Sequence, residues 1–211
     1  MCLRMAQKTG AEWNGIRGKR MNKNTLIIEN GTTSLDDVRQ YITDVVIPDS
    51  VTSIGYETFK NCSNLKSITI PNGVIFIGWR AFQNCESLKR MSIPHSVTKI
   101  DWEAFSGCSS LTEITIPDSV TKIGDGAFED CFSLTSIDIP YSVTYIGDYN
   151  FCNCQSLTEI SIPDSVTEIG DYAFLGCTSL KSIYIDKEKG TLDISDAEIP
   201  KDCKVYWKGE F

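Results

Sequence analysis

Cysteine is the most reactive residue type in this chain, and six of its nine copies recur at intervals of 23 residues. They are Cys62, Cys85, Cys108, Cys131, Cys154 and Cys177. A zinc site would need ligand pairs about two to four residues apart, which this spacing does not provide. A row of buried, reduced thiols fits the spacing, because free cysteine packs as a small hydrophobe. Disulfides between neighbouring copies are the alternative, since copies stacked as strands would lie about 4.8 Å apart.

The only histidine is His95, so a Ser-His-Asp or Cys-His nucleophilic site would have to include it. It follows Pro94, at a position that other copies fill with Asp, Asn or Tyr. A solvated turn residue is therefore the competing interpretation. The chain contains neither a P-loop nor a G-x-G-x-x-G motif. The sequence predicts no catalytic residue, no cofactor and no metal ligand.

The elements that carry these residues form six repeats of 23 residues between positions 47 and 185, without an insertion. Phenylalanine keeps the same register as cysteine, at Phe59, Phe82, Phe105, Phe128, Phe151 and Phe174. Self-similarity at such a period is the signature of a stacked repeat protein. An isolated copy could not offset the entropy of ordering its backbone, so neighbouring copies must share one core.

Within one copy, Leu111, Ile114 and Ile116 have the spacing of a short strand with alternate residues inward, and Pro117 ends it. Such strands are expected to pair side by side as a parallel sheet. Val120 and Ile123 would then face the core from the opposite wall.

A glycine follows this second wall in five copies, and Asp101 takes its place in the sixth. The glycine predicts either a positive φ or a close approach of two backbones. A helix of one to two turns is expected next, around Ala127 and Phe128. The residue before each repeat cysteine is Asn, Asp or Gly, types that tolerate the left-handed conformation at the end of a helix.

The flanks of the repeats divide the chain into four predicted parts. Residues 1–24 carry six Lys/Arg and one Glu and lack the apolar core of a secretory signal, so they are interpreted as a basic, disordered leader. Residues 25–46 are predicted to form an N-terminal cap, with a strand and then a short helix from Ser34. Residues 47–185 hold the repeats. Residues 186–211 are predicted to form a C-terminal cap that closes with a strand at 203–207.

Beyond the leader the chain holds 14 basic and 27 acidic residues, within a formal net charge of -8. Nucleic acid and anionic membranes need a positive field, so neither is an expected partner. No stretch approaches the roughly 18 apolar residues of a membrane-spanning helix, so membrane insertion is not expected.

The phrase IPDSVTKIGDGAFEDCFSLTSID at 116–138 resembles the 23-residue leucine-rich repeat of the BspA type, common in bacterial surface proteins. The resemblance covers about 47–185. It implies an α/β solenoid, a horseshoe or arc with a parallel β-sheet on the concave side and short helices or extended turns on the convex side.

The resemblance also implies a function, a non-enzymatic recognition or adhesion scaffold. We expect a monomer that binds a protein or glycan. Relatives are cell-surface or secreted proteins, whereas this chain shows no signal peptide, so its localisation stays open. Alternatives are a structural spacer module of a larger surface protein, or a hydrolase built on concave-face carboxylates, which a flat sheet without a pocket disfavours.

Candidate binding residues lie where the copies differ. On the outward positions of the concave strands these are Arg90, Glu113, Asp138, Glu159 and Tyr184, among serines and threonines. This surface is interpreted either as a ligand contact or as a solvated face.

A second group shares one repeat position in three successive copies, namely Tyr56, Trp79 and Trp102. Later copies have aspartate there. Exposed aromatic residues are typical interface anchors, and lateral packing of the three against each other is the alternative.

Overall fold

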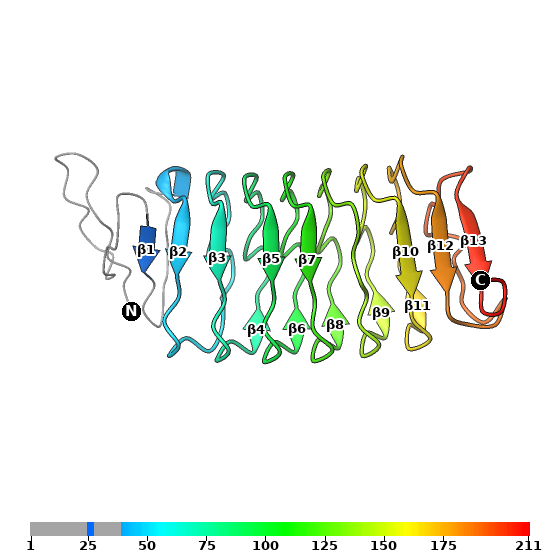
Figure 1. Cartoon of the computed structure of the whole chain (residues 1–211), viewed down its shortest axis with the longest axis horizontal. Coiled ribbons are helices and arrows are strands. Elements are labelled where there is room, and N and C mark those ends of the chain that lie inside the picture. Colours follow the sequence, from blue (N-terminus) through cyan, green and yellow to red (C-terminus); the bar gives the residue numbers. More distant parts are fainter. Residues whose placement is uncertain (1–24, 28–38) are drawn as a thin grey trace.

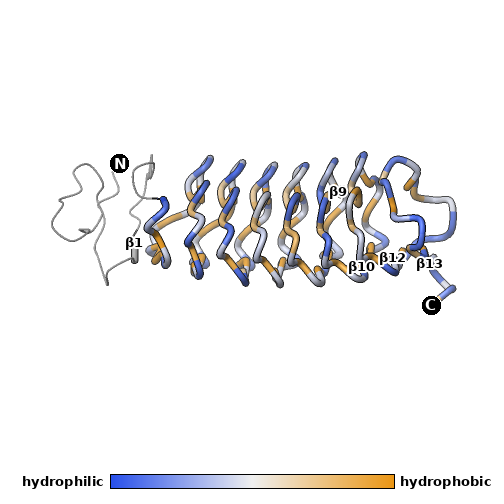
Figure 2. Tube along the Cα trace, turned by 90° about the horizontal axis from the view of Figure 1, so that it is seen from above, coloured by the Kyte–Doolittle hydropathy of each residue, from blue (hydrophilic) through white to orange (hydrophobic). Residues whose placement is uncertain are grey.

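The computed structural model describes residues 25–27 and 39–211. The predicted leader and the start of the predicted cap helix lie outside the described residues. The chain winds into a stack of coils, and each 23-residue repeat forms one coil (Figure 1). Figures 1 and 2 show the coils in a nearly straight row, so the curvature of the expected arc is slight.

One wall of the stack consists of parallel strands in three hydrogen-bonded groups, of three, two and three strands along the chain. Its strands are β1 (Thr25–Ile27), β2 (Asp44–Val46), β3 (Ser67–Thr69), β5 (Arg90–Ser92), β7 (Glu113–Thr115), β10 (Glu159–Ile162), β12 (Ser182–Ile185) and β13 (Lys204–Trp207). The coil between β7 and β10 joins through a single bridge from Asp138 to Ser161. Strand β13 pairs in parallel with β12, so the predicted last strand is present. The outward side of this sheet is called the broad face below.

The opposite wall is a second parallel sheet. It consists of β4 (Phe76–Ile77), β6 (Lys99–Ile100), β8 (Lys122–Ile123), β9 (Tyr145–Ile146) and β11 (Glu168–Ile169), in the order β11-β9-β8-β6-β4. The second residue of each strand points inward, and Ile123 is 1% exposed. The sequence placed Val120 and Ile123 on this wall correctly.

The predicted helices on the convex side are wrong, because tight turns take their place. The one helical element in the described part of the chain is a 3-10 turn, η1 (Arg39–Tyr41). Alternate backbone N–H groups donate to the next coil, as Phe105 does to the carbonyl of Ala127 at 2.9 Å and Gly107 to that of Glu129 at 2.8 Å. These bonds exclude the continuous local pattern that a helix needs.

Left-handed residues bound each of these turns. The residue before every repeat cysteine has a positive φ, from 58° at Asp130 to 74° at Gly176, which confirms the prediction for that position. A second left-handed residue stands four positions earlier, for example Glu103 at φ 50°.

The repeated glycine serves close approach and not a positive φ. A Cβ on Gly147 would lie 2.7 Å from the Cα and 2.8 Å from the backbone nitrogen of Asp125 in the preceding coil. In the first coil, a Cβ on Gly55 would meet only Oγ1 of Thr58, at 3.6 Å. Close approach thus accounts for glycine in four of the five coils that pack on an earlier repeat, while Asp101 holds the position in the fifth.

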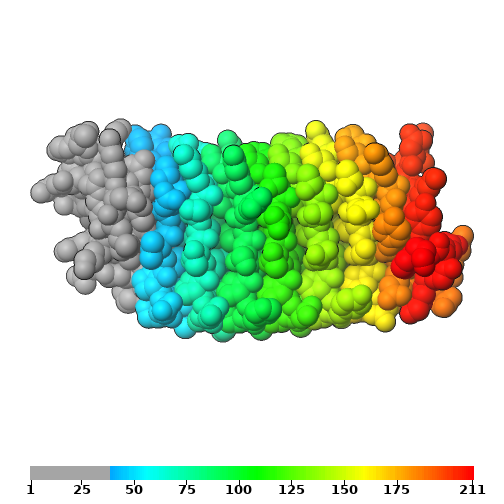
Figure 3. Space-filling view, in the orientation of Figure 1, coloured from blue at the N-terminus to red at the C-terminus, as the bar shows by residue number. Residues whose placement is uncertain are grey.

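The core is one continuous column of apolar side chains. Figure 2 shows that every coil of the stack contributes hydrophobic stretches of the chain. The six repeat phenylalanines are fully buried, and neighbouring rings stack with centroids 5.2–5.8 Å apart. Each coil forms a band across the surface in Figure 3, so a change of side chain in one copy alters one band only.

Candidate binding surfaces

The repeat cysteines are a structural row. All cysteines in the described residues are free, and the six of the repeat are fully buried. Five of these thiols donate to the phenylalanine carbonyl of the preceding coil, with Sγ–O distances between 3.0 Å and 3.3 Å. Burial raises the pKa of Cys108 to about 12, so its thiolate form is suppressed. A protonated, sequestered thiol is neither a nucleophile nor a metal ligand.

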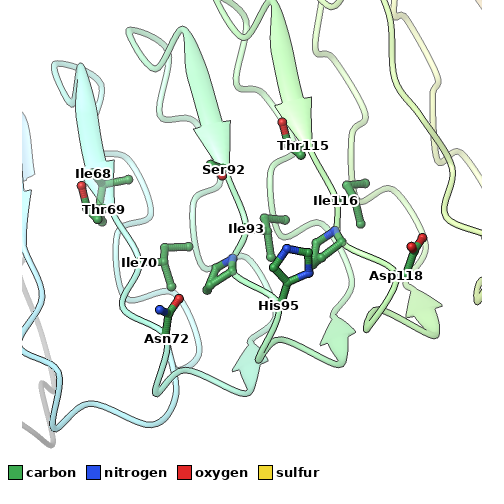
Figure 4. A pocket seen from close by; sticks show the side chains of 12 residues that line it. Ile68, Thr69, Ile70, Asn72, Ser92, Ile93, His95, Thr115, Ile116 and Asp118 are labelled. Atoms are coloured by element: carbon green, nitrogen blue, oxygen red, sulfur yellow. The ribbon is translucent and has the colours of Figure 1, made fainter.

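His95 lies on the rim of a shallow hollow of about 490 Å³ in the broad face. Figure 4 shows it between Asn72 and Asp118 in the neighbouring coils, above the isoleucines of the sheet. No hydrogen bond joins its ring to a serine, cysteine or carboxylate in the described chain. The constellation needed for nucleophilic catalysis is therefore not assembled around it.

The charged residues predicted on the broad face are exposed, and they do not form one cluster. Arg90 lies opposite Glu113 in the register of β5 and β7, with 3.7 Å between Nε and Oε2. Glu113 and Glu159 share a repeat position, and Ser136 stands between them. Asp138 lies in another row, opposite Ser161, so no two of these three carboxylates face each other in the strand register.

A second hollow of about 350 Å³ lies toward the β13 end of the broad face and is called the C-terminal hollow. The predicted residues Asp138 and Tyr184 line it together, with Ser161 between them in the same register. Sequence reasoning missed two of its aromatic residues, Tyr141 and Phe211, which are 71% and 65% exposed. The signal for Tyr141 was present, because neighbouring copies have aspartate at its position after proline.

The lateral ridge is the row of side chains that follows the repeated glycine position. It consists of Tyr56, Trp79, Trp102, Asp125, Asp148 and Asp171. Tyr56 and Trp79 contact each other with ring centroids 5.0 Å apart. Trp102 is 51% exposed and Tyr56 59% exposed, whereas Trp79 is half-buried. Lateral packing thus accounts for the first pair, while Trp102 presents much of its ring to solvent.

Ion pairs border the aromatic part of this ridge. The guanidinium of Arg80 lies 4.5 Å from the ring centroid of Trp79, and its Nε donates to Oε2 of Glu103 at 2.9 Å. This hydrogen bond raises the pKa of Arg80 further. A hydrogen bond from Lys60 lowers the pKa of Glu57. On the ridge, a paired cation of the adjoining row thus packs against Trp79.

The model of the BspA type leucine rich repeat region matches residues 38–156 and 121–197, in six copies. The chain belongs to the BspA-type leucine-rich repeat family. A leucine-rich repeat protein from Bacteroides ovatus is similar, with 38% identity over 79% of this chain and a TM-score of 0.70. The present chain spans 42% of that protein's length.

Two further solved structures resemble this family member. The leucine-rich repeat protein of T. pallidum shares 32% identity over 74% of this chain and 78% of its own, with a TM-score of 0.68. A leucine-rich cell surface protein from Faecalibacterium prausnitzii shares 25% identity over 81% of this chain and 61% of its own, with a TM-score of 0.52. No curated protein matches the chain. Family and fold are those of a repeat scaffold for interaction.

In the described part of this BspA-type chain, no helix has the length and apolarity to cross a bilayer. Nor do His, Cys, Asp and Glu side chains gather there in a group of three suited to a metal ion.

Proposed function

We propose that this chain is a non-enzymatic recognition scaffold that binds a protein or glycan partner through exposed positions at which its coils differ. The observation that supports this proposal is that several buried repeat positions hold the same residue in every copy, whereas exposed positions vary. Phe, Leu and Cys occupy the same buried positions in every copy. By contrast, Arg90, Glu113 and Glu159 share an exposed position at which the other three copies have serine, and Asp138 and Tyr184 share one at which the other four have serine or threonine.

Two surfaces carry the proposed contacts. The broad face offers Arg90, Glu113 and Glu159 as exposed charges, and the lateral ridge offers Trp102 and Tyr56 as exposed rings. Large aromatic residues give much contact area at a low cost in side-chain entropy, which is why they anchor interfaces. We further propose that the chain acts at the cell surface, because the similar protein from Faecalibacterium prausnitzii is a cell surface protein.

An array of immobilised peptides and glycans, probed with the full chain, tests this function. Trp102→Ala reports on the lateral ridge and Arg90→Ala on the broad face. Tyr172→Ala is the matched control, because Tyr172 is 40% exposed one position beyond the ridge and stacks on Tyr149 at 5.1 Å. Thermal unfolding of each variant verifies that the fold is retained.

The proposal expects the chain to bind a defined set of array members, with loss of signal in Trp102→Ala or Arg90→Ala and an unchanged signal in Tyr172→Ala. Silence of the folded wild-type chain on both arrays would contradict recognition. That result would favour a spacer within a longer surface protein, a role that fits a chain spanning 42% of its Bacteroides relative.

A further inference from the structure

We propose that the C-terminal hollow binds the side chain of a lysine or arginine in a basic segment of a partner protein. This inference rests on the recognition function proposed above and gives it a partner class. The residues that carry it are Asp138, Tyr141, Ser161, Tyr184, Asp186 and Phe211.

The hollow exists because a small residue separates two larger ones in one row of the broad face. Asp138, Ser161, Tyr184 and Tyr206 occupy the same register position on successive strands. Parallel strands lie about 4.8 Å apart, so the aspartate and Tyr184 stand roughly 10 Å from each other across the serine. Ile162, which is 1% exposed, gives this gap an apolar floor.

The charge of the lining favours a cation. Its ionisable acids are Asp138 and Asp186, and no basic side chain lines the hollow within the described residues. Asp186 stands where the six repeats have proline, and Nζ of the chain's own Lys208 lies 3.2 Å from its Oδ1. The carboxylate of Asp138 has no hydrogen-bond or ion-pair partner in the described chain. Asp186 thus forms an ion pair with a lysine of this chain, and Asp138 is unpaired.

The aromatic rings favour a cation on a long apolar stem. Tyr141 is 71% exposed, while Tyr184 stacks on Tyr206 at 5.3 Å and meets the edge of Phe211 at 5.5 Å. An aromatic face attracts an ammonium or guanidinium group within about 6 Å of its centroid.

The same pairing of cation and ring occurs elsewhere in the chain. Arg80 lies 4.5 Å from the ring centroid of Trp79, and Nζ of Lys99 lies 5.4 Å from that of Phe76. In the hollow, a lysine or arginine stem would lie along the apolar floor with its head between Tyr141 and Asp138. A neutral glycan could stack on the rings, but the negative charge of the hollow would not attract it.

The test titrates the full chain with a blocked pentapeptide, acetyl-Gly-Lys-Arg-Lys-Gly-amide. The companion probes are the same peptide with norleucine at each basic position and a neutral hexasaccharide. Tyr141→Ala and Asp138→Asn are each expected to weaken binding of the basic peptide about tenfold. The norleucine peptide is expected not to bind.

Two variants serve as matched controls. Glu168→Gln removes an exposed carboxylate from the second sheet and changes the net charge as Asp138→Asn does. Tyr172→Ala removes an exposed ring beside the lateral ridge. Both are expected to bind the basic peptide as the wild-type chain does.

Three results would overturn the inference. Equal weakening by Glu168→Gln and Asp138→Asn would indicate diffuse attraction to an acidic protein. Binding of the hexasaccharide in place of the peptide, lost in Tyr141→Ala, would assign the hollow to a glycan and leave the recognition function intact. Failure of the wild-type chain to bind either probe at millimolar concentration would refute the site, whereas the array decides the proposed function independently.

Discussion

The two halves of the lateral ridge share one backbone and present opposite chemistry. In the first three coils Tyr56, Trp79 and Trp102 extend over the surface, and Tyr56 and Trp102 keep more than half of their area exposed. In the later coils two of the three aspartates, Asp125 and Asp148, accept hydrogen bonds from the next coil, while Asp171 is exposed. Oδ1 of Asp125 accepts from the Tyr145 hydroxyl at 3.1 Å, and Oδ1 of Asp148 from the backbone N–H of Asp171 at 2.9 Å.

This difference teaches how function can be added to a periodic fold. At Asp125 and Asp148 the carboxylate accepts a hydrogen bond from the next coil, so a structural role accounts for these two side chains. Where the ridge residue is aromatic, Trp102 stacks on no other ring of the described chain, although its Cδ1 lies close over Gly124 in the next coil. The exposed half of the Trp102 ring is therefore available for a partner.

The largest effect on stability is expected from substituting the repeated glycine, which lies beneath the ridge. If the two halves share one backbone, this glycine must be packed equally closely in both. A Cβ on Gly124 would lie 2.6 Å from the backbone nitrogen of Trp102, and one on Gly147 2.8 Å from that of Asp125. Either substitution by alanine should cost about 3 kcal/mol, measured by urea unfolding, because backbone atoms must move. Gly55→Ala is the control and should be neutral or stabilising by up to about 1 kcal/mol. A tolerated Gly124→Ala would show that the aromatic half is looser.

Alkaline pH should reveal whether the interior is the same in both halves. Burial raises the pKa of Cys108 and of Cys177 to about 12, from an ordinary value of 9.0. A raised folded-state pKa contributes stability that is complete below pH 9 and is lost as pH rises toward 12, because the unfolded thiol ionises first.

Between pH 9 and pH 12, each such thiol should lower the free energy of unfolding by up to about 1.4 kcal/mol per pH unit. When the pH rises from 8 to 10.5, the free energy of unfolding of Cys108→Ala and of Cys177→Ala should therefore fall by about 2 kcal/mol less than that of the wild-type chain, as measured by urea unfolding. If only one of the two variants kept the pH dependence of the wild-type chain, the burial of the thiols would differ between the two halves.

Asn150 breaks the interior pattern in the later half, so its substitution sharpens the comparison. Other copies have alanine here, except Thr58 in the first. Asn150 is fully buried, its Nδ2 donates to the carbonyl of Gly124 at 2.7 Å, and its Oδ1 has no partner. Asn150→Ala removes an unsatisfied acceptor and one hydrogen bond, so the free energy of unfolding should change by less than about 1 kcal/mol. A loss well above that would mean that Oδ1 has a partner in solution.

The interior could be predicted from the sequence because its periodicity is strict. A row such as Phe59 to Phe174 allows one arrangement, in which identical side chains stack. The turns could not be predicted so well. Ala127 and Phe128 are good helix residues, but the N–H of Phe128 donates to Asn150 in the next coil at 3.0 Å, and such bonds between coils leave no visible trace in one copy.

The candidate sites were predicted only in part, for a geometric reason. Strand alternation identified Asp138 and Tyr184 as outward residues, and the structure places both in one hollow. Tyr141 follows the proline that ends its strand, and Phe211 lies in the tail, so alternation could not rank either of them. Register across coils, and not spacing within a copy, brings these residues together.

The most direct test of the account replaces the aromatic exceptions by the residue of other copies. A variant carrying Tyr56→Asp, Trp79→Asp, Trp102→Asp and Tyr141→Asp leaves every interior row unchanged. Its binding on the peptide and glycan arrays is the decisive measurement, with thermal unfolding as the control of fold. The account predicts a chain that still folds cooperatively, with a melting midpoint lowered by the loss of the Tyr56–Trp79 contact, and that has lost its array signal. A folded variant that binds as the wild-type chain does would contradict it.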